Sequence, residues 1–293
     1  PFMAGVGVES DPCACVSGMV LSLQGNSITI SRKLWEQGVQ DATALKEKIH
    51  NRWGKRTYTF AVIFPFSPQE ILLRRWLQSA GVAPDAGVRI ISVPPSQMFP
   101  MLKLGYIDGF CVSEPWTSLA VQAGSGVCVA TSSQLAPLHP EKVLAVRQSF
   151  AIGRADEHER LIAALVEACA YCDSPANAQF LSEMLSPYVN APSDCLASFA
   201  HKTNSEQQGL SIFSRYNANL PDDDKARWLM AGLYELLEPN CFAVRDLKRT
   251  PVLKNVFRRD IFDRAGALSS KAAMQRPAPV SMESNLSPRV ALS

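Results

Sequence analysis

The chain has 293 residues, of which 47% are hydrophobic and 19% are charged, and its formal net charge is +2. This composition is typical of a globular protein with a sizeable core. The net charge is close to zero and no run of Lys and Arg occurs, which argues against direct nucleic-acid binding, and no apolar stretch is long enough to cross a bilayer.

The first predicted elements are two strands within residues 18–31, on either side of a turn at Gly25 and Asn26, followed by a helical segment at residues 32–50. Strands and helices then alternate. The strands are predicted at residues 58–64, 88–93, 107–112 and 126–131, and the helices at residues 67–81, 96–105 and 114–124. Residues 141–151 begin as a strand. This alternation predicts an α/β fold with a parallel sheet and right-handed crossovers.

From His158 onward the sequence predicts long helices, one of them at residues 158–173 and another at residues 220–239. The second opens with Pro221 and three aspartates, which suit the first turn of a helix. Residues 271–293 have no apolar periodicity, and we expect them to form a disordered tail.

Eight cysteines are spread along the chain, at positions 13, 15, 111, 128, 169, 172, 195 and 241. Cys111 and Cys128 lie in apolar strand-like runs, so both are predicted to be buried. Cys169 and Cys172 match C-x-x-C, but they lie in the middle of a predicted helix, which favours core packing over redox chemistry. The spacing is not that of a small disulfide scaffold, and we expect a reducing compartment.

Three consecutive strands are each followed by a serine that opens the next helix, namely Ser67, Ser96 and Ser113. Ser67 and Glu70 form an S-x-x-E capping box, with Pro68 at the first helical position. In a parallel sheet these helix N-termini lie along one edge, where their free N–H groups attract anions. The pattern predicts a small-anion site, and the alternative is that the serines only stabilise their helices.

Catalytic and metal chemistry is not visible in the sequence. The four histidines, at positions 50, 139, 158 and 201, are far apart and lack the spacing of metal ligands. The sequence contains neither a G-x-S-x-G motif nor a Walker-type loop. We therefore expect no catalytic residues, no metal and no other cofactor.

The stretches "VPPSQMFPMLKLGYIDGFCVSEPW", "HPEKVLAV" and "YNANLP", the last followed by "ARWLM", resemble the nitrate-binding family of ABC-transporter solute-binding proteins. That family includes bicarbonate-binding relatives and cytoplasmic nitrate/nitrite sensors. The similarity extends over residues 1–268, and the stretch through "GFCVSEPW" is highly specific. The resemblance implies a periplasmic-binding-protein fold of type II, in which two α/β lobes close on a ligand.

The resemblance also implies how the chain divides. Lobe I would comprise residues 1–31 and 143–270, and lobe II residues 32–142. Members of the family open with a strand–helix run that carries a pocket tryptophan, and this run is not found here. Lobe I is therefore expected to be incomplete, and the chain is expected to bind nitrate poorly.

Five positions match the anion contacts of the family. They are Asn26, Gln69, Pro95, Val112 and Lys142. Gln69 replaces a frequent histidine, and its amide can donate a hydrogen bond but cannot become cationic. The resemblance gives Lys142 the role of a cationic ligand, and because bicarbonate-binding relatives carry an acidic residue there, Lys142 favours nitrate or nitrite.

Four further residues are expected to support this site. They are Ser67, Ser113, Glu114 and Trp116. Ser113 replaces the usual glycine and could add a hydroxyl donor. Glu114 and Trp116 are interpreted as capping and packing residues. The alternative for Lys142 is a surface charge beside Glu141, which is the commoner position of a lysine.

The resemblance leads to three functional hypotheses. The first is a cytoplasmic nitrate or nitrite sensor that regulates nitrate assimilation, in which lobe closure changes the binding of an antiterminator partner with an RNA-binding response-regulator domain. The alternative is the periplasmic solute-binding component of an ABC nitrate transporter, with a membrane permease as its partner. The third is an enzyme similar to the pyrimidine-synthase relatives of this fold, for which Lys142 is the candidate reactive group.

Overall fold

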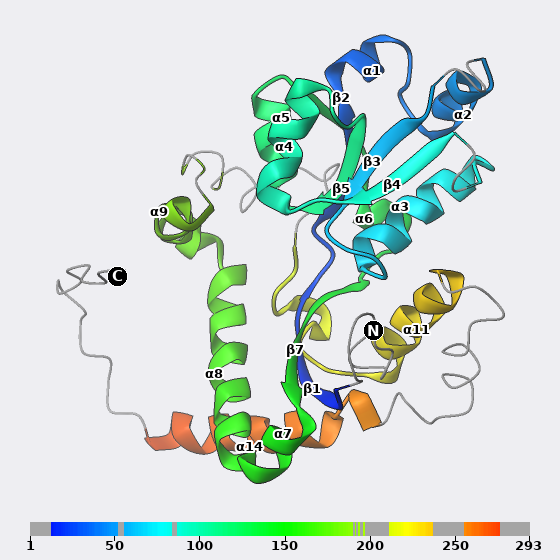
Figure 1. Ribbon diagram of the computed structural model, residues 1–293. Coiled ribbons are helices and arrows are strands. Elements are labelled where there is room, and N and C mark those ends of the chain that lie inside the picture. Colours follow the sequence, from blue (N-terminus) through cyan, green and yellow to red (C-terminus); the bar gives the residue numbers. More distant parts are fainter. Residues whose placement is uncertain are drawn as a thin grey trace, which may run out of the picture.

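In the part of the chain that the computed structural model describes, two β-sheets have helices packed around them (Figure 1). The residues it describes are 13–51, 56–83, 87–189, 191, 193, 196, 211–236 and 255–275, with the side chains of the last range described to residue 268. Strands and helices are mixed throughout these ranges, so the predicted α/β class is confirmed. Each helix of the described ranges is too short or too polar to cross a bilayer.

The larger sheet has five strands in the described part of the chain. They are β2 (Asn26–Ser31), β3 (Tyr58–Val62), β4 (Val88–Ser92), β5 (Gly109–Ser113) and β6 (Gly126–Thr131), in the spatial order β4-β3-β5-β2-β6. Strand β3 is parallel to β4 and β5, whereas β2 is antiparallel to β5 and β6. The prediction of an all-parallel sheet is wrong at β2, because this strand enters directly from β1 without a helical crossover.

Helices cover both faces of this sheet. They are α1 (Arg32–Glu36), α2 (Ala42–Asn51), α3 (Pro68–Ser79), α4 (Pro95–Leu104), α5 (Trp116–Gln122) and α6 (Ser132–Leu135). Leu73 of α3 and Cys111 of β5 belong to one hydrophobic cluster, whereas Met98 of α4 and Val112 of β5 belong to another. Successive residues of a strand point to opposite faces, so the two clusters lie on opposite sides of the sheet.

Two sequence predictions in this region are corrected. The helical segment predicted at residues 32–50 is split into α1 and α2, because Gly38 takes a φ of +93°, in the left-handed region that favours glycine. Cys111 is buried as predicted, but Cys128 is exposed. The reason is that Cys128 lies on β6, which forms an edge of the sheet.

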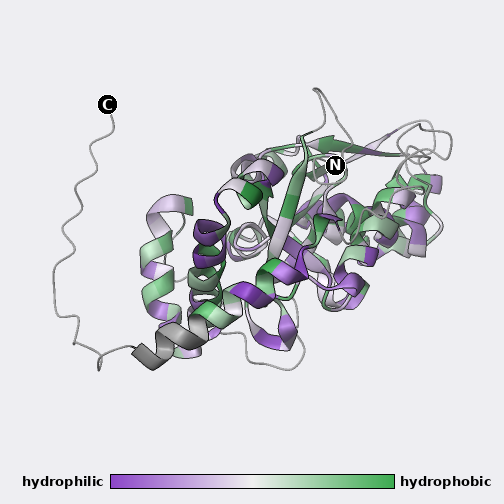
Figure 2. Cartoon of the chain, turned by 90° about the horizontal axis from the view of Figure 1, so that it is seen from below, coloured by the Kyte–Doolittle hydropathy of each residue, from purple (hydrophilic) through white to green (hydrophobic). Residues whose placement is uncertain are grey.

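The smaller sheet consists, within the described residues, of β1 (Cys15–Leu23) paired antiparallel with β7 (Pro140–Arg147). The segments that follow β7 are α7 (Gln148–Gly153), α8 (Ala155–Asp173), η2 (Pro175–Asn177), α9 (Ala178–Val189), η3 (Arg215–Asn217), α11 (Asp223–Leu236) and α14 (Arg259–Gln275). Met19 of β1 packs with Ile162 of α8 and Ile261 of α14. Cys169 is buried in the same cluster, which supports a packing role for it. The helices carry both hydrophilic and hydrophobic residues (Figure 2).

Two chain segments connect the sheets, one between β1 and β2 and one between α6 and β7. In the first, Gln24 and Gly25 have positive φ angles, as does Leu138 in the second. The backbone N–H of Gln24 donates to the carbonyl oxygen of His139 at 3.0 Å, and the N–H of Leu138 donates to Oε1 of Gln24 at 2.8 Å. The two segments are therefore bonded to each other where the sheets meet.

The expected boundary of lobe I at residue 31 differs from this arrangement, because β2 lies inside the five-stranded sheet. We propose instead that the lobes divide at residues 24–25 and 136–139. At the other end of the chain, α14 continues to Gln275, so residues 271–275 of the expected tail are helical. Residues 276–293 lie outside the described part of the chain.

Candidate functional site

Polar side chains gather at the edge of the five-stranded sheet that adjoins the smaller sheet. Strands β3, β4 and β5 end at this edge, and β2 begins there with Asn26, which pairs with Ser113 at the end of β5. Helix α3 begins at the same edge, and β7 enters the smaller sheet nearby with Pro140 and Glu141. The site therefore draws residues from both sheets.

Glu141 is the centre of this cluster. Nε2 of Gln69 donates to Oε1 of Glu141 at 2.7 Å and lies 3.1 Å from Oδ1 of Asn26. Nδ2 of Asn26 donates to Oε2 of Glu141. Nζ of Lys142 lies 3.2 Å from Oε1 of the same carboxylate. Two neutral amides and one ammonium group thus point at one planar O–C–O group.

Burial sets the electrostatics of the cluster. The side chain of Glu141 is 2% exposed, whereas that of Lys142 is 55% exposed. Loss of hydration raises the pKa of the Glu141 carboxyl above its ordinary value, and the charge of Lys142 and the hydrogen bonds from Asn26 and Gln69 oppose this rise. The pKa of the Glu141 carboxyl therefore depends on its contacts with Asn26, Gln69 and Lys142.

The local sequence explains how Gln69 reaches this position. Oγ of Ser67 accepts a hydrogen bond from the backbone N–H of Glu70 at 3.3 Å, and Pro68 is at the first helical position, so the predicted N-cap of α3 is confirmed. The carboxylate of Glu70 accepts from the N–H of Phe66, at 2.8 Å, which fixes the entry into the helix. Gln69 is therefore held in the first helical turn and is buried.

The other two predicted N-caps are wrong. Helix α4 begins at Pro95 with Pro94 before it, so Ser96 lies inside the first turn. Helix α5 begins at Trp116 after Pro115, and Ser113 remains the last residue of β5. In both places proline, with its fixed φ, takes the position at the start of the helix.

The remaining predicted residues occupy the same edge of the sheet with different roles. Val112 is fully buried on β5, and its side chain packs in the core below α4. Pro95 follows β4 at the outer strand of the sheet. Glu114 accepts a hydrogen bond from the N–H of Ser118 at 3.1 Å, and Trp116 packs against the core, in agreement with capping and packing roles.

The cluster contains one residue that the sequence analysis did not assign to the site, Glu141. The signal was the strand pattern of "PEKVLAVR", in which neighbouring residues face opposite sides, so that Glu141 and Lys142 cannot both point inward. The structure turns Glu141 toward Asn26 and Gln69 and leaves Lys142 at the rim.

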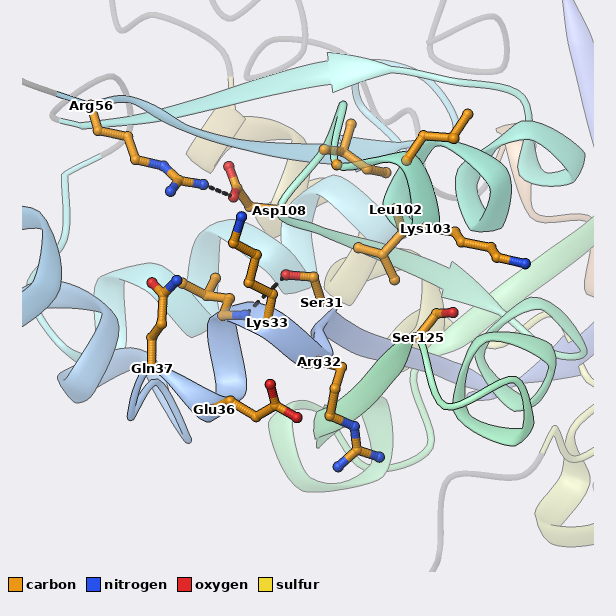
Figure 3. A pocket seen from close by; sticks show the side chains of 14 residues that line it. Ser31, Arg32, Lys33, Glu36, Gln37, Arg56, Leu102, Lys103, Asp108 and Ser125 are labelled. Atoms are coloured by element: carbon orange, nitrogen blue, oxygen red, sulfur yellow. Dashed lines mark hydrogen bonds and ion pairs between the residues drawn. The ribbon is translucent and has the colours of Figure 1, made fainter.

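The cavity drawn in Figure 3 lies at the opposite end of the same sheet, near the end of β2 and the start of β5. Its volume is about 430 Å³. Arg56 pairs with Asp108, whose Oδ2 also accepts a hydrogen bond from the N–H of Thr59 at 2.9 Å. The side chains of Arg32 and Lys103 extend away from this pair (Figure 3). These groups do not converge on one point, so the cluster around Glu141 is the better candidate site.

Among the described residues, no group of His, Cys, Asp and Glu side chains has an arrangement that could hold a metal ion. The polar cluster has a different chemistry, because its donors are two carboxamides and an ammonium group. Carboxamide and ammonium groups donate hydrogen bonds to negatively charged oxygen atoms. In this structure they bind the carboxylate oxygens of Glu141.

A family model described as the NMT1-like family matches residues 1–186. The chain is 38% identical over 184 residues to the bicarbonate transport ATP-binding protein CmpC of Synechocystis sp., covering 63% of this chain and 27% of that protein. It is 34% identical over 232 residues to the nitrate import ATP-binding protein NrtC of the same organism, covering 76% of this chain and 34% of that protein.

The similarity to solved structures concerns the fold. The crystal structure of the periplasmic nitrate-binding protein NrtA from Synechocystis PCC 6803 superposes with a TM-score of 0.77 at 23% identity, covering 92% of this chain and 72% of that one. The predicted two-lobe binding-protein fold of type II is confirmed. The chain spans 27% and 34% of the length of the two curated relatives named above.

Proposed function

Because the chain belongs to the NMT1-like family, we propose that it is the solute-binding part of an ABC-type import system for a small planar oxyanion, nitrate or hydrogencarbonate. The observation that carries this proposal is the convergence of Asn26, Gln69 and Lys142 on the buried carboxylate of Glu141. A carboxylate, a nitrate ion and a hydrogencarbonate ion share a planar arrangement of oxygen atoms around one central atom. Groups that donate hydrogen bonds to a carboxylate can therefore also donate them to nitrate or hydrogencarbonate.

Binding would couple the anion to lobe closure. Asn26 and Gln69 belong to the part of the chain around the five-stranded sheet, and Glu141 and Lys142 to the first residues of β7 in the smaller sheet. An oxyanion held between these two sets of groups interacts better with a closed arrangement than with an open one. Such a difference in affinity is what allows a ligand to shift a conformational equilibrium.

Glu141 makes hydrogencarbonate the favoured ligand of the two. Nitrate has no proton, so all of its oxygens would meet the Glu141 carboxylate with like charge. Hydrogencarbonate carries one O–H group that can donate to that carboxylate while its remaining oxygens accept from Gln69 and Lys142. The buried position of Glu141 therefore outweighs the argument from Lys142 for nitrate or nitrite.

The transport interpretation is better supported than the sensor interpretation. The relatives reported above are named as transport ATP-binding proteins and as a periplasmic nitrate-binding protein. They give support to an ABC permease as partner and to a periplasmic location, and none to an antiterminator partner in the cytoplasm. They are also named for binding and transport and not for catalysis, which supports a function other than that of an enzyme.

The proposal is tested by calorimetric titration of the full chain with sodium nitrate and, separately, with sodium hydrogencarbonate. We expect Gln69→Leu to weaken binding at least about tenfold, which corresponds to roughly 1.4 kcal/mol for the loss of one buried donor. Gln37→Leu, at an exposed position at the end of α1, is the matched control. Glu141→Gln should weaken hydrogencarbonate binding and strengthen nitrate binding, because it removes the buried negative charge. Failure of the wild-type chain to bind hydrogencarbonate, or hydrogencarbonate binding by Gln69→Leu equal to that of the wild type, would overturn the proposal.

A further inference from the structure

We propose that Trp228 of α11 is a positioning residue for the anion site, because its indole ring holds together the two chain segments that carry Gln69 and Glu141. This inference rests on the proposed function for its effect on affinity. The geometric part of the inference does not depend on that function: Trp228 contacts both the segment that carries Gln69 and the segment that carries Glu141.

Helix α11 bridges the two halves of the molecule. Ala226, near its start, is buried in a cluster with Val20 and Leu23 of β1. Trp228, two residues later, packs against the hydrophobic core of the five-stranded sheet. The helix also lies against α3 and β7. It therefore contacts elements on both sides of the place where the two sheets meet.

The ring of Trp228 contacts two side chains from different segments. On one side it stacks on His139, with ring centroids 4.8 Å apart and planes inclined by 24°. The guanidinium group of Arg75 lies 5.1 Å from its ring centroid. Both nitrogens of the Arg75 fork are fixed by Glu235 of α11, at 2.8 and 2.9 Å. A cation over the face of an indole is attracted to the ring electrostatically.

These two partners are connected directly to the anion site. Arg75 lies on α3, the helix whose first turn contains Gln69. His139 is two residues before Glu141, is buried, and donates from Nδ1 to the carbonyl oxygen of Pro140 at 3.1 Å. The indole thus sets how far α3 lies from the start of β7. That separation decides whether Nε2 of Gln69 stays 2.7 Å from the carboxylate of Glu141.

A second contact fixes the same helix pair close to Gln69. Gly232 of α11 lies against Ile71, the residue two positions after Gln69, and a Cβ atom at this glycine would come 2.3 Å from Cδ1 of Ile71. A methyl group at this position would force the side chain of Ile71 to move. Trp228, Gly232 and Glu235 therefore hold α3 along its length, from its first turn to Arg75.

The test compares Trp228→Ala and Trp228→Phe in the full chain, with Trp35→Ala as matched control. Trp35 lies on α1, and the guanidinium group of Arg32 is 5.5 Å from its ring, so the control removes a similar contact far from Glu141. We expect Trp228→Ala to weaken hydrogencarbonate binding about tenfold or more in calorimetry. Trp228→Phe, which keeps an aromatic ring against His139, should restore most of the affinity, and Trp35→Ala should change nothing.

A second readout does not depend on a ligand. The side-chain amide protons of Gln69, which are directed at Glu141 and Asn26, should exchange with solvent faster in Trp228→Ala than in the wild type, as measured by NMR. If Trp228→Ala does not fold, Glu235→Gln releases the Arg75 fork with little change in volume and should show the same faster exchange. Unchanged amide exchange overturns the inference whether or not an anion binds. A wild-type chain that binds neither anion, with faster exchange in Trp228→Ala, overturns the proposed function alone.

Discussion

At the scale of single residues, the site depends on which side chain of a strand points inward. Pro140, Glu141 and Lys142 follow one another at the start of β7, and the strand places the carboxylate inside and the ammonium group at the rim. In its ionised form this buried carboxylate repels a proton-free anion and accepts a hydrogen bond from an anion that carries a proton. The ligand preference thus follows from the direction of one side chain.

Burial also shifts the pKa of a base, His139, in the direction that favours its neutral form. Burial lowers the pKa of its imidazole from 6.5 to about 4, and Nε2 has no hydrogen-bond partner among the described residues. Between pH 6.5 and 4 the unfolded chain takes up a proton that the folded chain refuses. The stability contributed by neutral His139 is therefore present above pH 6.5 and is lost as the pH falls toward 4.

We predict that His139→Gln weakens this pH dependence. A shift from 6.5 to about 4 corresponds to roughly 3 kcal/mol of stability lost on acidification. Urea unfolding of the wild type and of His139→Gln at pH 7 and pH 4.5 measures the difference, with His50→Gln, at an exposed position, as control. Identical losses of stability in wild type and His139→Gln would show that this imidazole is protonated as readily in the folded chain as in water.

At the scale of elements, the close contact of α11 with α3 depends on Gly232, which has no side chain. Replacing Gly232 with Ala improves the intrinsic helix propensity by about 1 kcal/mol. The new methyl group would overlap Ile71, which is buried, and overpacking of this kind costs about 1–3 kcal/mol. The steric term is the larger one.

We therefore expect Gly232→Ala to be destabilising by up to about 2 kcal/mol in urea unfolding, despite the better helix former. Gly266→Ala in α14 is the matched control, because a Cβ there meets nothing within 4 Å, and it should be neutral or stabilising. A stabilised Gly232→Ala would mean that α11 is not seated against α3 as described.

Elements could be predicted from the sequence where the residues that determine them are close together in the chain. The α3 start was predictable, because Ser67, Pro68 and Glu70 act within one turn. The direction of β2 was not, since its pairing with β5 and β6 involves residues about 80 to 100 positions away. The sequence shows Gly38 inside a helical pattern, but a glycine alone does not end a helix. The helix ends there because the φ of Gly38 is positive, and this angle is seen only in the structure.

At the scale of the whole molecule, the family and the two-lobe fold predicted from motifs are confirmed by the family match and by the structural similarity to NrtA. Three of the residues predicted for the anion site lie in one polar cluster. Asn26, Gln69 and Lys142 do come together, but the distance between α3 and β7 cannot be inferred from the sequence, so Glu141 remained unassigned to the site. The contact of α11 with both sheets is likewise a property of the folded chain, since α11 follows Gln69 by more than 150 residues.

The central claim is that the donors around Glu141 hold a planar oxyanion between the two sheets. A crystal structure of the chain grown with sodium hydrogencarbonate tests it most directly. We predict an anion within hydrogen-bonding distance of Nε2 of Gln69 and of the Glu141 carboxyl, with Lys142 drawn inward. An anion bound instead beside Arg32 and Lys33, with the Gln69–Glu141 contact unchanged, would contradict it.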